Sequence, residues 1–283
     1  MVGIGHATRG GVAPDALDTP DALLQIRELS LVFGGLRAID RVSTAVRARE
    51  LVALIGPNGA GKTSLLNCIN GYYTPSLGGI DFEGRGVAGL PPHRLAALGI
   101  SRAFQMAEII PQASVLENVM VGRHIHTHSG LWASMVFWGA AEREQIRHRE
   151  VVEEILELME LEPFRWRRAG ELAYGTQKLV GVARALAMEP RLLLLDEPSS
   201  GMSRQEKEDL ARFLLRIRHE RPVAMIWVEH DMQMVKDLAD RVVVLDYGRK
   251  IFDGPPADAL RDPAVVEAYL GRPILTGEET VPC

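Results

Sequence analysis

Cysteine, excess basic charge and long apolar runs are all scarce in this 283-residue sequence. The two cysteines, Cys68 inside an apolar segment and Cys283 at the last position, give no disulfide framework, which fits a reducing compartment. The formal net charge of −5 makes nucleic acid an unexpected partner. The longest charge-free apolar stretch, 130–141, is shorter than the roughly 20 residues that a membrane-spanning helix needs.

The rest of the composition is that of a globular protein with a substantial core, because 47% of the residues are hydrophobic and 24% are charged. No apolar region follows the N-terminal methionine, so a signal peptide is not expected. We expect a chain that is soluble when expressed alone, or peripheral to a partner. Residues 1–21, rich in glycine, alanine, proline and aspartate, are predicted to form a flexible tail.

The apolar pattern predicts an α/β fold with a mostly parallel sheet. Alternating residues over 23–50 indicate strands of an antiparallel layer, and LVALI (51–55) reads as a buried strand that leads into a glycine loop. Three further apolar strands, separated by helical segments, fit a parallel sheet covered by helices. These strands are RLLLLDE (191–197), PVAMIWVEHD (222–231) and DRVVVLDYG (240–248).

Helical spacing replaces this pattern between about residues 106 and 185, where we expect a helical subdomain inserted into the α/β core. We therefore divide the chain into a flexible tail, a nucleotide-binding domain, a C-terminal helical extension and a polar tail. Their expected bounds are 1–21, 22–254, 255–272 and 273–283.

The segment GPNGAGKT has the phosphate-loop pattern G-x-x-x-x-G-K-[ST], between a predicted strand and a predicted helix. Its glycines let the backbone curl so that N–H groups face phosphate oxygens. Lys62 is expected to reach the β- and γ-phosphates, and the hydroxyl of Thr63 to bind Mg²⁺. The candidate ATP-binding residues here are Gly56, Pro57, Asn58, Gly59, Ala60, Gly61, Lys62, Thr63 and Ser64.

Candidate catalytic residues follow other predicted strands. Asp196 and Glu197 end a strand at the edge where parallel sheets bind ligands, so we expect Asp196 to support Mg²⁺ and Glu197 to activate the attacking water. A neutral His230 would hydrogen-bond the γ-phosphate and hold the water and Glu197 in line. Gln105 offers an amide to Mg²⁺ and water. Each of these residues also has a simpler interpretation when it is taken alone. The acids could cap the end of a strand, His230 could be structural, and Gln105 could be an ordinary surface residue.

A second candidate anion site lies in ELAYGTQK (171–178), directly before the apolar-periodic LVGVARALA. A glycine beside a helix start exposes backbone N–H groups, and the helix dipole favours negative charge there. The chain would thus carry two phosphate sites.

The order of these motifs resembles the ATP-binding subunits of ABC transporters, over roughly residues 23–272. The resemblance implies that Phe33 stacks on adenine, Gln105 is the Q-loop residue, SSGMS (199–203) is the D-loop and His230 is the switch histidine. It also implies that two such subunits pack head to tail, so that the second anion site contacts the γ-phosphate of the partner's ATP. That signature consists of Leu172, Ala173, Tyr174, Gly175 and Thr176.

The signature departs from the family's common Leu-Ser-Gly-Gly-Gln. Ala173 lacks the serine hydroxyl, and losing one hydrogen bond to a charged group costs about 1.5–3 kcal/mol when nothing replaces it. We therefore expect a weakened ATP sandwich, with hydrolysis at the chain's own phosphate loop retained through Glu197 and His230.

The segments FGGLRAID (33–40), LAYG and DPAVVEAYLG (262–271) resemble the LivG-type ATP-binding subunits of branched-chain amino acid importers. Relatives that import urea or short amides look similar. The resemblance implies ATP and Mg²⁺ as cofactors and a second ATP-binding subunit, the same chain or a related one. It also implies two transmembrane permease subunits, a periplasmic binding protein and a place at the cytoplasmic face of the inner membrane. It implies further that the two ATP-binding subunits close on ATP and that this movement is passed to the permeases through the segment after Gln105.

Other functions fit the sequence less well. A soluble ABC ATPase acting on nucleic acid or the ribosome usually carries two ATP-binding domains or a long coiled coil, and neither is present. A regulatory module without hydrolysis is opposed by Glu197 and His230. The histidines of RHIHTH, His124, His126 and His128, suit a surface segment better than a metal site. The stretch 130–141, with two tryptophans, suits a partner contact or core packing.

Overall fold

The computed structural model describes residues 22–103, 109–127 and 140–270. Several predictions fall outside these ranges: the flexible tail, the polar tail, Gln105, and nearly all of the stretch 130–141. None of the described helices is both long and apolar enough to cross a bilayer.

The larger sheet has six strands in the order β10-β9-β3-β8-β7-β6. All of its neighbours pair in parallel except β10 and β9, and every residue of β3, β7 and β8 is buried. The parallel pairing confirms the predicted parallel sheet. Because its central strands are buried throughout, the sheet is covered on both faces. The strands are β3 (Leu51–Ile55), β6 (Ile100–Ala103), β7 (Leu192–Asp196), β8 (Ala224–Val228), β9 (Arg241–Asp246) and β10 (Arg249–Gly254).

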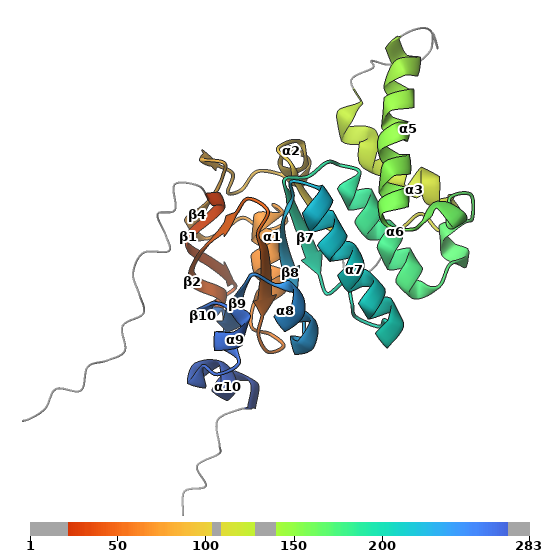
Figure 1. The fold of residues 1–283 in the computed structure, drawn as a ribbon. Helices are drawn as coiled ribbons and strands as arrows, with labels where there is room; N and C mark the ends of the chain where they lie inside the picture. The colour runs from red at the N-terminus through yellow and green to blue at the C-terminus, as the bar shows by residue number, and fades with distance from the viewer. Residues whose placement is uncertain (1–21, 104–108, 128–139, 271–283) are drawn as a thin grey trace, which may run out of the picture.

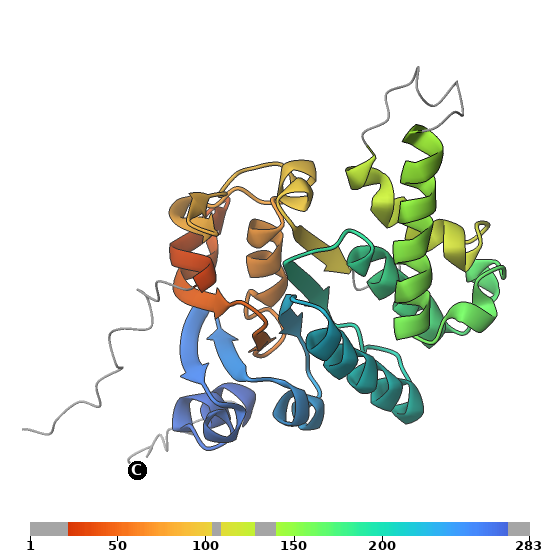
Figure 2. The same cartoon turned by 45° about the horizontal axis from the view of Figure 1, so that its top comes forward.

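A second, four-stranded sheet is antiparallel, in the order β2-β1-β4-β5. Its strands are β1 (Ala22–Phe33), β2 (Leu36–Arg47), β4 (Leu77–Phe82) and β5 (Arg85–Gly86). This confirms the predicted antiparallel layer. The two sheets meet where Arg249 of β10 bonds the carboxylate of Asp40 of β2 at 2.8 Å. Figure 2 shows the C-terminal strands, in blue, beside the N-terminal strands, in red.

Helix α1 (Lys62–Ile69) lies between the two sheets (Figure 1). Leu65, Leu66 and Ile69 pack into one apolar cluster with residues of β1, β2, β3 and β8. Cys68 belongs to this cluster, and burial raises the pKa of its thiol to about 11. This burial agrees with the place of Cys68 inside an apolar segment of the sequence.

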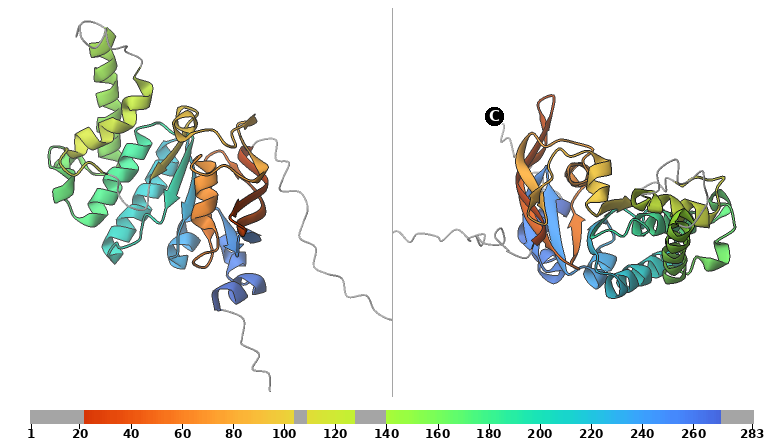
Figure 3. Two further views of the ribbon diagram at one scale, coloured as in Figure 1. Left: turned by 180° about the vertical axis from the view of Figure 1, so that it is seen from behind. Right: turned by 90° about the horizontal axis from the view of Figure 1, so that it is seen from above.

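The other face of the sheet is covered by helices that extend to one side of the molecule (Figure 3). Val152, Ile155, Leu156 and Met159, which recur at helical spacing within the predicted helical region, are all buried in this second cluster. The helices are α3 (Val115–Val121), α5 (Ala140–Leu158), α6 (Tyr174–Leu186) and α7 (Arg204–Glu220). The 3-10 turn η1 (Gly122–His126) follows α3, η2 (Glu162–Phe164) and η3 (Ala169–Glu171) lie between α5 and α6, and β7 separates α6 from α7.

Shorter helices complete the chain. The helix α2 (Pro92–Ala97) precedes β6, and α8 (Met232–Leu238) lies between β8 and β9. After β10, the helices α9 (Pro256–Ala259) and α10 (Pro263–Leu270) end the described part.

A buried arginine ties the helical part together. Arg123 of η1 donates from Nε to Nδ1 of His148 in α5 at 3.2 Å. It also donates from Nη1 to the carbonyl oxygen of Ala187 at 2.9 Å and to the Glu189 carboxylate at 2.7 Å, both just beyond α6. One guanidinium therefore joins three segments of the helical part.

The neighbouring histidines of RHIHTH have separate surroundings. His124 is exposed, and Nε2 of His126 lies 3.0 Å from the carbonyl oxygen of Met188. His128 lies outside the described residues. Among the residues with a described placement, no group of three or more potential metal ligands occurs.

The His148 contact predicts a pH dependence of stability. Burial, with the charge of Arg123 beside it, holds the pKa of the imidazole below its ordinary value of about 6.5. The unfolded chain therefore takes up a proton at this residue at a higher pH than the folded chain does. The free energy of unfolding should fall as the pH drops below about 6.5 and level off below the folded pKa.

Urea unfolding of wild type and His148→Gln at about pH 7 and about pH 5 checks this. The Gln variant keeps a hydrogen-bond acceptor without a titrating ring, so its loss of stability across this range should be smaller. His219→Gln, at an exposed position on α7, serves as the matched control. An equal loss in all three proteins contradicts the assignment to His148.

Candidate functional site

The phosphate loop joins the end of β3 to the start of α1, as predicted, and two of its glycines permit close backbone packing. A Cβ at Gly56 would lie 2.1 Å from the carbonyl oxygen of Leu245, and one at Gly61 2.6 Å from that of Ala38. Both residues have positive φ angles, +146° and +101°. Only glycine combines this backbone with this packing.

Lys62, the first residue of α1, folds back over the loop. Its Nζ donates to the carbonyl oxygens of Gly56 at 2.7 Å and Pro57 at 2.9 Å. Burial lowers the pKa of the ammonium, while the carboxylates of Glu197 and Asp196 act in the opposite direction. The lysine is therefore a partly desolvated cation with two acids nearby.

A cavity of about 470 Å³ opens over this loop. Phe33 lines it from the end of β1 and is 44% exposed. The ring of Tyr73 meets Phe33 edge-on, with centroids 5.0 Å apart at 76°, which leaves a face of Phe33 open to a ligand. The cavity residues are Phe33, Leu36, Arg37, Ala38, Asn58, Gly59, Ala60, Gly61, Lys62, Thr63, Ser64, Glu197, Tyr247 and Gly248.

Glu197 and His230 meet at this site. Nε2 of His230, two residues after β8, lies 2.7 Å from Oε1 of Glu197, the residue after β7. The backbone of Glu197 has φ of +48°, in the left-handed region, and its N–H donates to the carbonyl oxygen of Val228 at 3.1 Å. The carboxylate that the sequence predicts to activate water is thus held by the predicted histidine.

Asp196, the last residue of β7, is buried and makes a salt bridge with Arg102 of β6. Nη2 of Arg102 lies 2.6 Å from Oδ2 of Asp196, and Nη1 donates to Oδ1 of Asn67 in α1 at 2.5 Å. The other carboxylate oxygen, Oδ1 of Asp196, is buried and has no hydrogen-bond partner among the residues that the structure describes. Such an atom is costly to leave unsatisfied.

These residues fit a hard cation such as Mg²⁺. Carboxylate and hydroxyl oxygens are its preferred protein ligands, and it usually keeps several waters. Oδ1 of Asp196 is one candidate ligand. Thr63, at the start of α1, is another, and it lines the cavity over the phosphate loop. Gln105, the third predicted ligand, lies outside the described residues.

The predicted signature stands apart from this cavity. Ala173 is the N-cap of α6 and makes no side-chain capping bond, and Tyr174 starts the helix. The carboxylate of Glu206 in α7 lies against Gly175, where an added Cβ would come within 2.2 Å of Oε1. None of the residues from 172 to 176 is among those that line the cavity over the phosphate loop. The structure therefore places the two predicted anion sites of the chain separately.

Glu206 also belongs to the first turn of its own helix. Ser203 and Glu206 form a capping box, and Ser203 N donates to Oε2 of Glu206 at 2.8 Å. Hydrogen bonds from Ser203 hold the pKa of the Glu206 carboxyl below its usual range.

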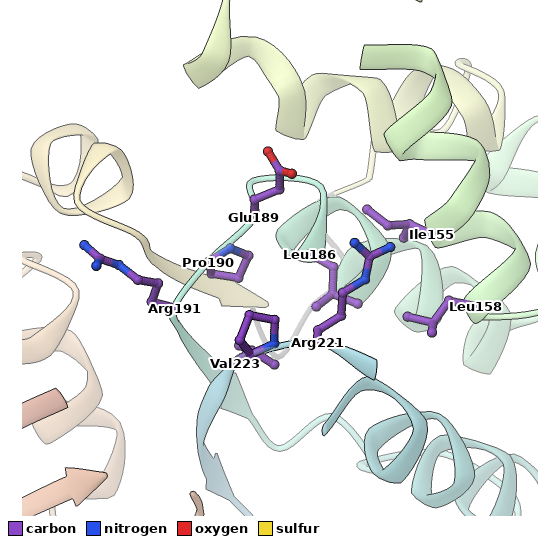
Figure 4. Close-up of a pocket in the computed structure, with 9 residues that line it drawn as sticks. Ile155, Leu158, Leu186, Glu189, Pro190, Arg191, Arg221 and Val223 are labelled. Atoms are coloured by element: carbon purple, nitrogen blue, oxygen red, sulfur yellow. The ribbon is translucent and has the colours of Figure 1, made fainter. Parts of the chain in front are cut away.

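A different cavity, of about 170 Å³, lies at the opposite edge of the sheet, where β7 and β8 begin (Figure 4). Apolar residues of α5 and α6 line it, together with Arg191 and Arg221. Arg221 is paired with Glu154, and Arg191 with Glu83. Its one lining acid, Glu189, is paired with Arg123, and its lining includes neither the phosphate loop nor the Asp196–Glu197 pair and His230 at the other end of the strands.

Several site residues were missed by the sequence reasoning. Arg37 and Tyr247 line the cavity because β2 and the β9–β10 turn meet the phosphate loop: the N–H of Gly248 donates to the carbonyl oxygen of Ala60 at 2.9 Å. Arg102 reaches Asp196 across 94 positions of sequence. No local pattern marks any of these residues.

Comparison with protein families matches residues 39–200 to the model described as ABC transporter. Residues 249–273 match the model described as branched-chain amino acid ATP-binding cassette transporter. The second match covers β10, α9 and α10.

Curated relatives align over most of the chain. The high-affinity branched-chain amino acid transport ATP-binding protein BraF of Pseudomonas aeruginosa is 36% identical over 250 residues, or 88% of this chain and 98% of that protein. LivG of Escherichia coli, of the same description, is 34% identical over the same coverage.

A solved structure described as the ADP conformation of an ATP-binding cassette of an ABC transporter matches with a TM-score of 0.77. It is 29% identical, and the match covers 89% of this chain and 99% of that one. The fold, the phosphate loop and the family match agree. The chain belongs to the ABC transporter family, as an ATP-binding cassette.

Proposed function

We propose that this chain is the ATP-hydrolysing subunit of an importer for branched-chain or related amino acids. The observation that carries the proposal is the 2.7 Å contact between His230 and Glu197 at the rim of the phosphate-loop cavity. A binding module without hydrolysis has no use for such a pair. The family match supports the hydrolase reading.

ATP would bind with its adenine on the open face of Phe33 and its phosphates in the loop from Gly56 to Ser64. Lys62 would exchange the carbonyl oxygens of Gly56 and Pro57 for phosphate oxygens, which are better acceptors for an ammonium. Thr63, Asp196 and Gln105 would hold Mg²⁺, whose charge neutralises the phosphate oxygens when it is bound.

Hydrolysis requires a water in line with the γ-phosphate and a group to orient it. Glu197 accepts a hydrogen bond from this water, and His230 holds the carboxylate in one orientation. The left-handed backbone of Glu197 aims its side chain from the strand end towards the cavity that it lines. The residues therefore act mainly by positioning, as phosphoryl transfer demands.

The signature would complete the site of a second ATP-binding subunit packed head to tail. It lies away from the cavity of its own chain and presents a helix start, which suits an anion from elsewhere. Ala173 supplies no hydroxyl, so backbone N–H groups would make the contact. The pair would sit beneath two permease subunits at the cytoplasmic face of the membrane, with solute delivered by a binding protein.

Branched-chain amino acids are the favoured solutes because the match at residues 249–273 and the names of BraF and LivG point to them. Urea and short amides are the alternative. The ATPase does not touch the solute in this scheme, so the assignment rests on the relatives.

Replacing Glu197 by Gln tests the hydrolytic role. The amide keeps the shape but loses the charge that orients water, so turnover should fall by about 10²- to 10⁴-fold while ATP still binds. Single-turnover hydrolysis and ATP binding on the purified full chain measure the two effects.

Glu208→Gln is the matched control, since Glu208 is an exposed carboxylate on α7 that pairs with Arg204. Its turnover should equal that of wild type. If Glu197→Gln hydrolyses ATP at the wild-type rate, Glu197 does not have the proposed role.

The solute assignment predicts a selective response of the assembled transporter. In vesicles that carry both ATP-binding subunits, the permeases and the binding protein, leucine should stimulate ATP hydrolysis and urea should not. Stimulation by urea alone would support the alternative instead.

A further inference from the structure

Lys178, one turn into α6, carries a charge that the proposed reaction does not use. The residue is 4% exposed, and a buried ammonium needs an acceptor for each of its N–H groups. Three backbone carbonyl oxygens lie within reach: those of Glu197 at 3.3 Å, Pro198 at 3.1 Å and Ser200 at 2.5 Å. All three belong to the segment that follows β7.

The first turn of α6 makes a further contact with this segment. The Nζ of Lys178 lies 5.1 Å from the centroid of the Tyr174 ring, a cation–π geometry. The same ring packs on Gly201, where an added Cβ would lie 3.0 Å from Cε1 of Tyr174. The signature turn and residues 197–201 are therefore in contact through two side chains.

The backbone that Lys178 binds requires such support. Glu197 is a non-glycine residue in the left-handed region, a conformation that persists only where its surroundings hold it. Its N–H is held by Val228, and its carbonyl oxygen accepts from the N–H of Ser200 at 3.2 Å and from Lys178. Loss of the lysine would release one of these constraints.

Charge compensation keeps the lysine in place. Burial lowers the pKa of the Lys178 ammonium, and the carboxylates of Glu229 and Glu197 counter this shift. Glu229 is itself buried and accepts from the N–H of His230 at 2.8 Å. The cation thus lies between the segments that carry the two members of the Glu197–His230 pair.

We propose that Lys178 is a positioning residue for hydrolysis. By binding the carbonyl oxygens of Glu197, Pro198 and Ser200, it fixes the Glu197 carboxylate relative to the signature turn of the same chain. The inference rests on the proposed role of Glu197. Lys178 does not line the nucleotide cavity, so it acts on turnover and not on ATP binding.

Two variants of the full chain test this. Lys178→Met removes the ammonium at similar length and should lower kcat by about tenfold or more, with the Kd for ATP within about twofold of wild type. Lys178→Arg keeps a cation and should restore most of kcat. Lys236→Met, at an exposed position on α8, is the control and should match wild type in both measurements.

Hydrogen exchange without nucleotide supplies a readout that does not depend on catalysis. The N–H groups of Ser200 and Met202 donate to the carbonyl oxygens of Glu197 and Ser199. In Lys178→Met their exchange should be about tenfold faster than in wild type, while amides of β3 are unchanged. If the Met variant does not fold, Lys178→Gln, which loses the charge but keeps two donors, is judged by the same measurements.

The outcomes separate this inference from the proposed function. Wild-type kcat in Lys178→Met, or a loss of ATP binding equal to the loss of kcat, overturns the positioning role. A different result separates the two proposals. If Glu197→Gln turns over normally while amide exchange at residues 200 and 202 is still faster in Lys178→Met, then Lys178 does hold the segment after β7, and the proposed role of Glu197 is wrong.

Discussion

The parallel pairing of β3, β7 and β8 sets Leu54, Val228 and Asp196 at one level of the larger sheet. Neighbouring strands lie about 4.8 Å apart, so the loops that leave these three strands start within about 10 Å of one another. The phosphate loop follows β3, the Asp196–Glu197 pair lies at the end of β7, and His230 lies in the loop after β8. A shift of one residue in either pairing would turn each side chain to the other face and separate the groups.

Buried cations hold the loops at this edge. Lys62 binds carbonyl oxygens of the phosphate loop, Arg102 binds the Asp196 carboxylate, and Lys178 binds carbonyl oxygens after β7. Each cation has hydrogen-bond acceptors, as burial of charge requires. The acids of the site, Asp196 and Glu197, therefore lie among fixed positive groups before any nucleotide arrives, which reduces the rearrangement that binding demands.

The sequence predicted those features of the site whose residues lie close together along the chain. The loop from Gly56 to Thr63 and the two acids at and just after the end of β7 were recognisable because each pattern lies within a few residues. The separate place of the signature came from family resemblance, since no local pattern says which phosphate a helix start serves. Tyr247 and Arg102 join the site through long-range contacts and could not be foreseen. Gln105 remains a prediction outside the described residues.

The carboxylate of Glu206 lies against the backbone of Gly175, so a negative group of the chain itself already stands at the start of α6. An anion that arrives there takes part in a competition, because it must replace one negative group by another. The net charge at the turn then stays nearly constant. The apparent affinity for the incoming anion depends on how much better that anion binds there than the Glu206 carboxylate does. A displaced Glu206 retains its bond from Ser203, so the exchange does not leave its carboxylate without a partner.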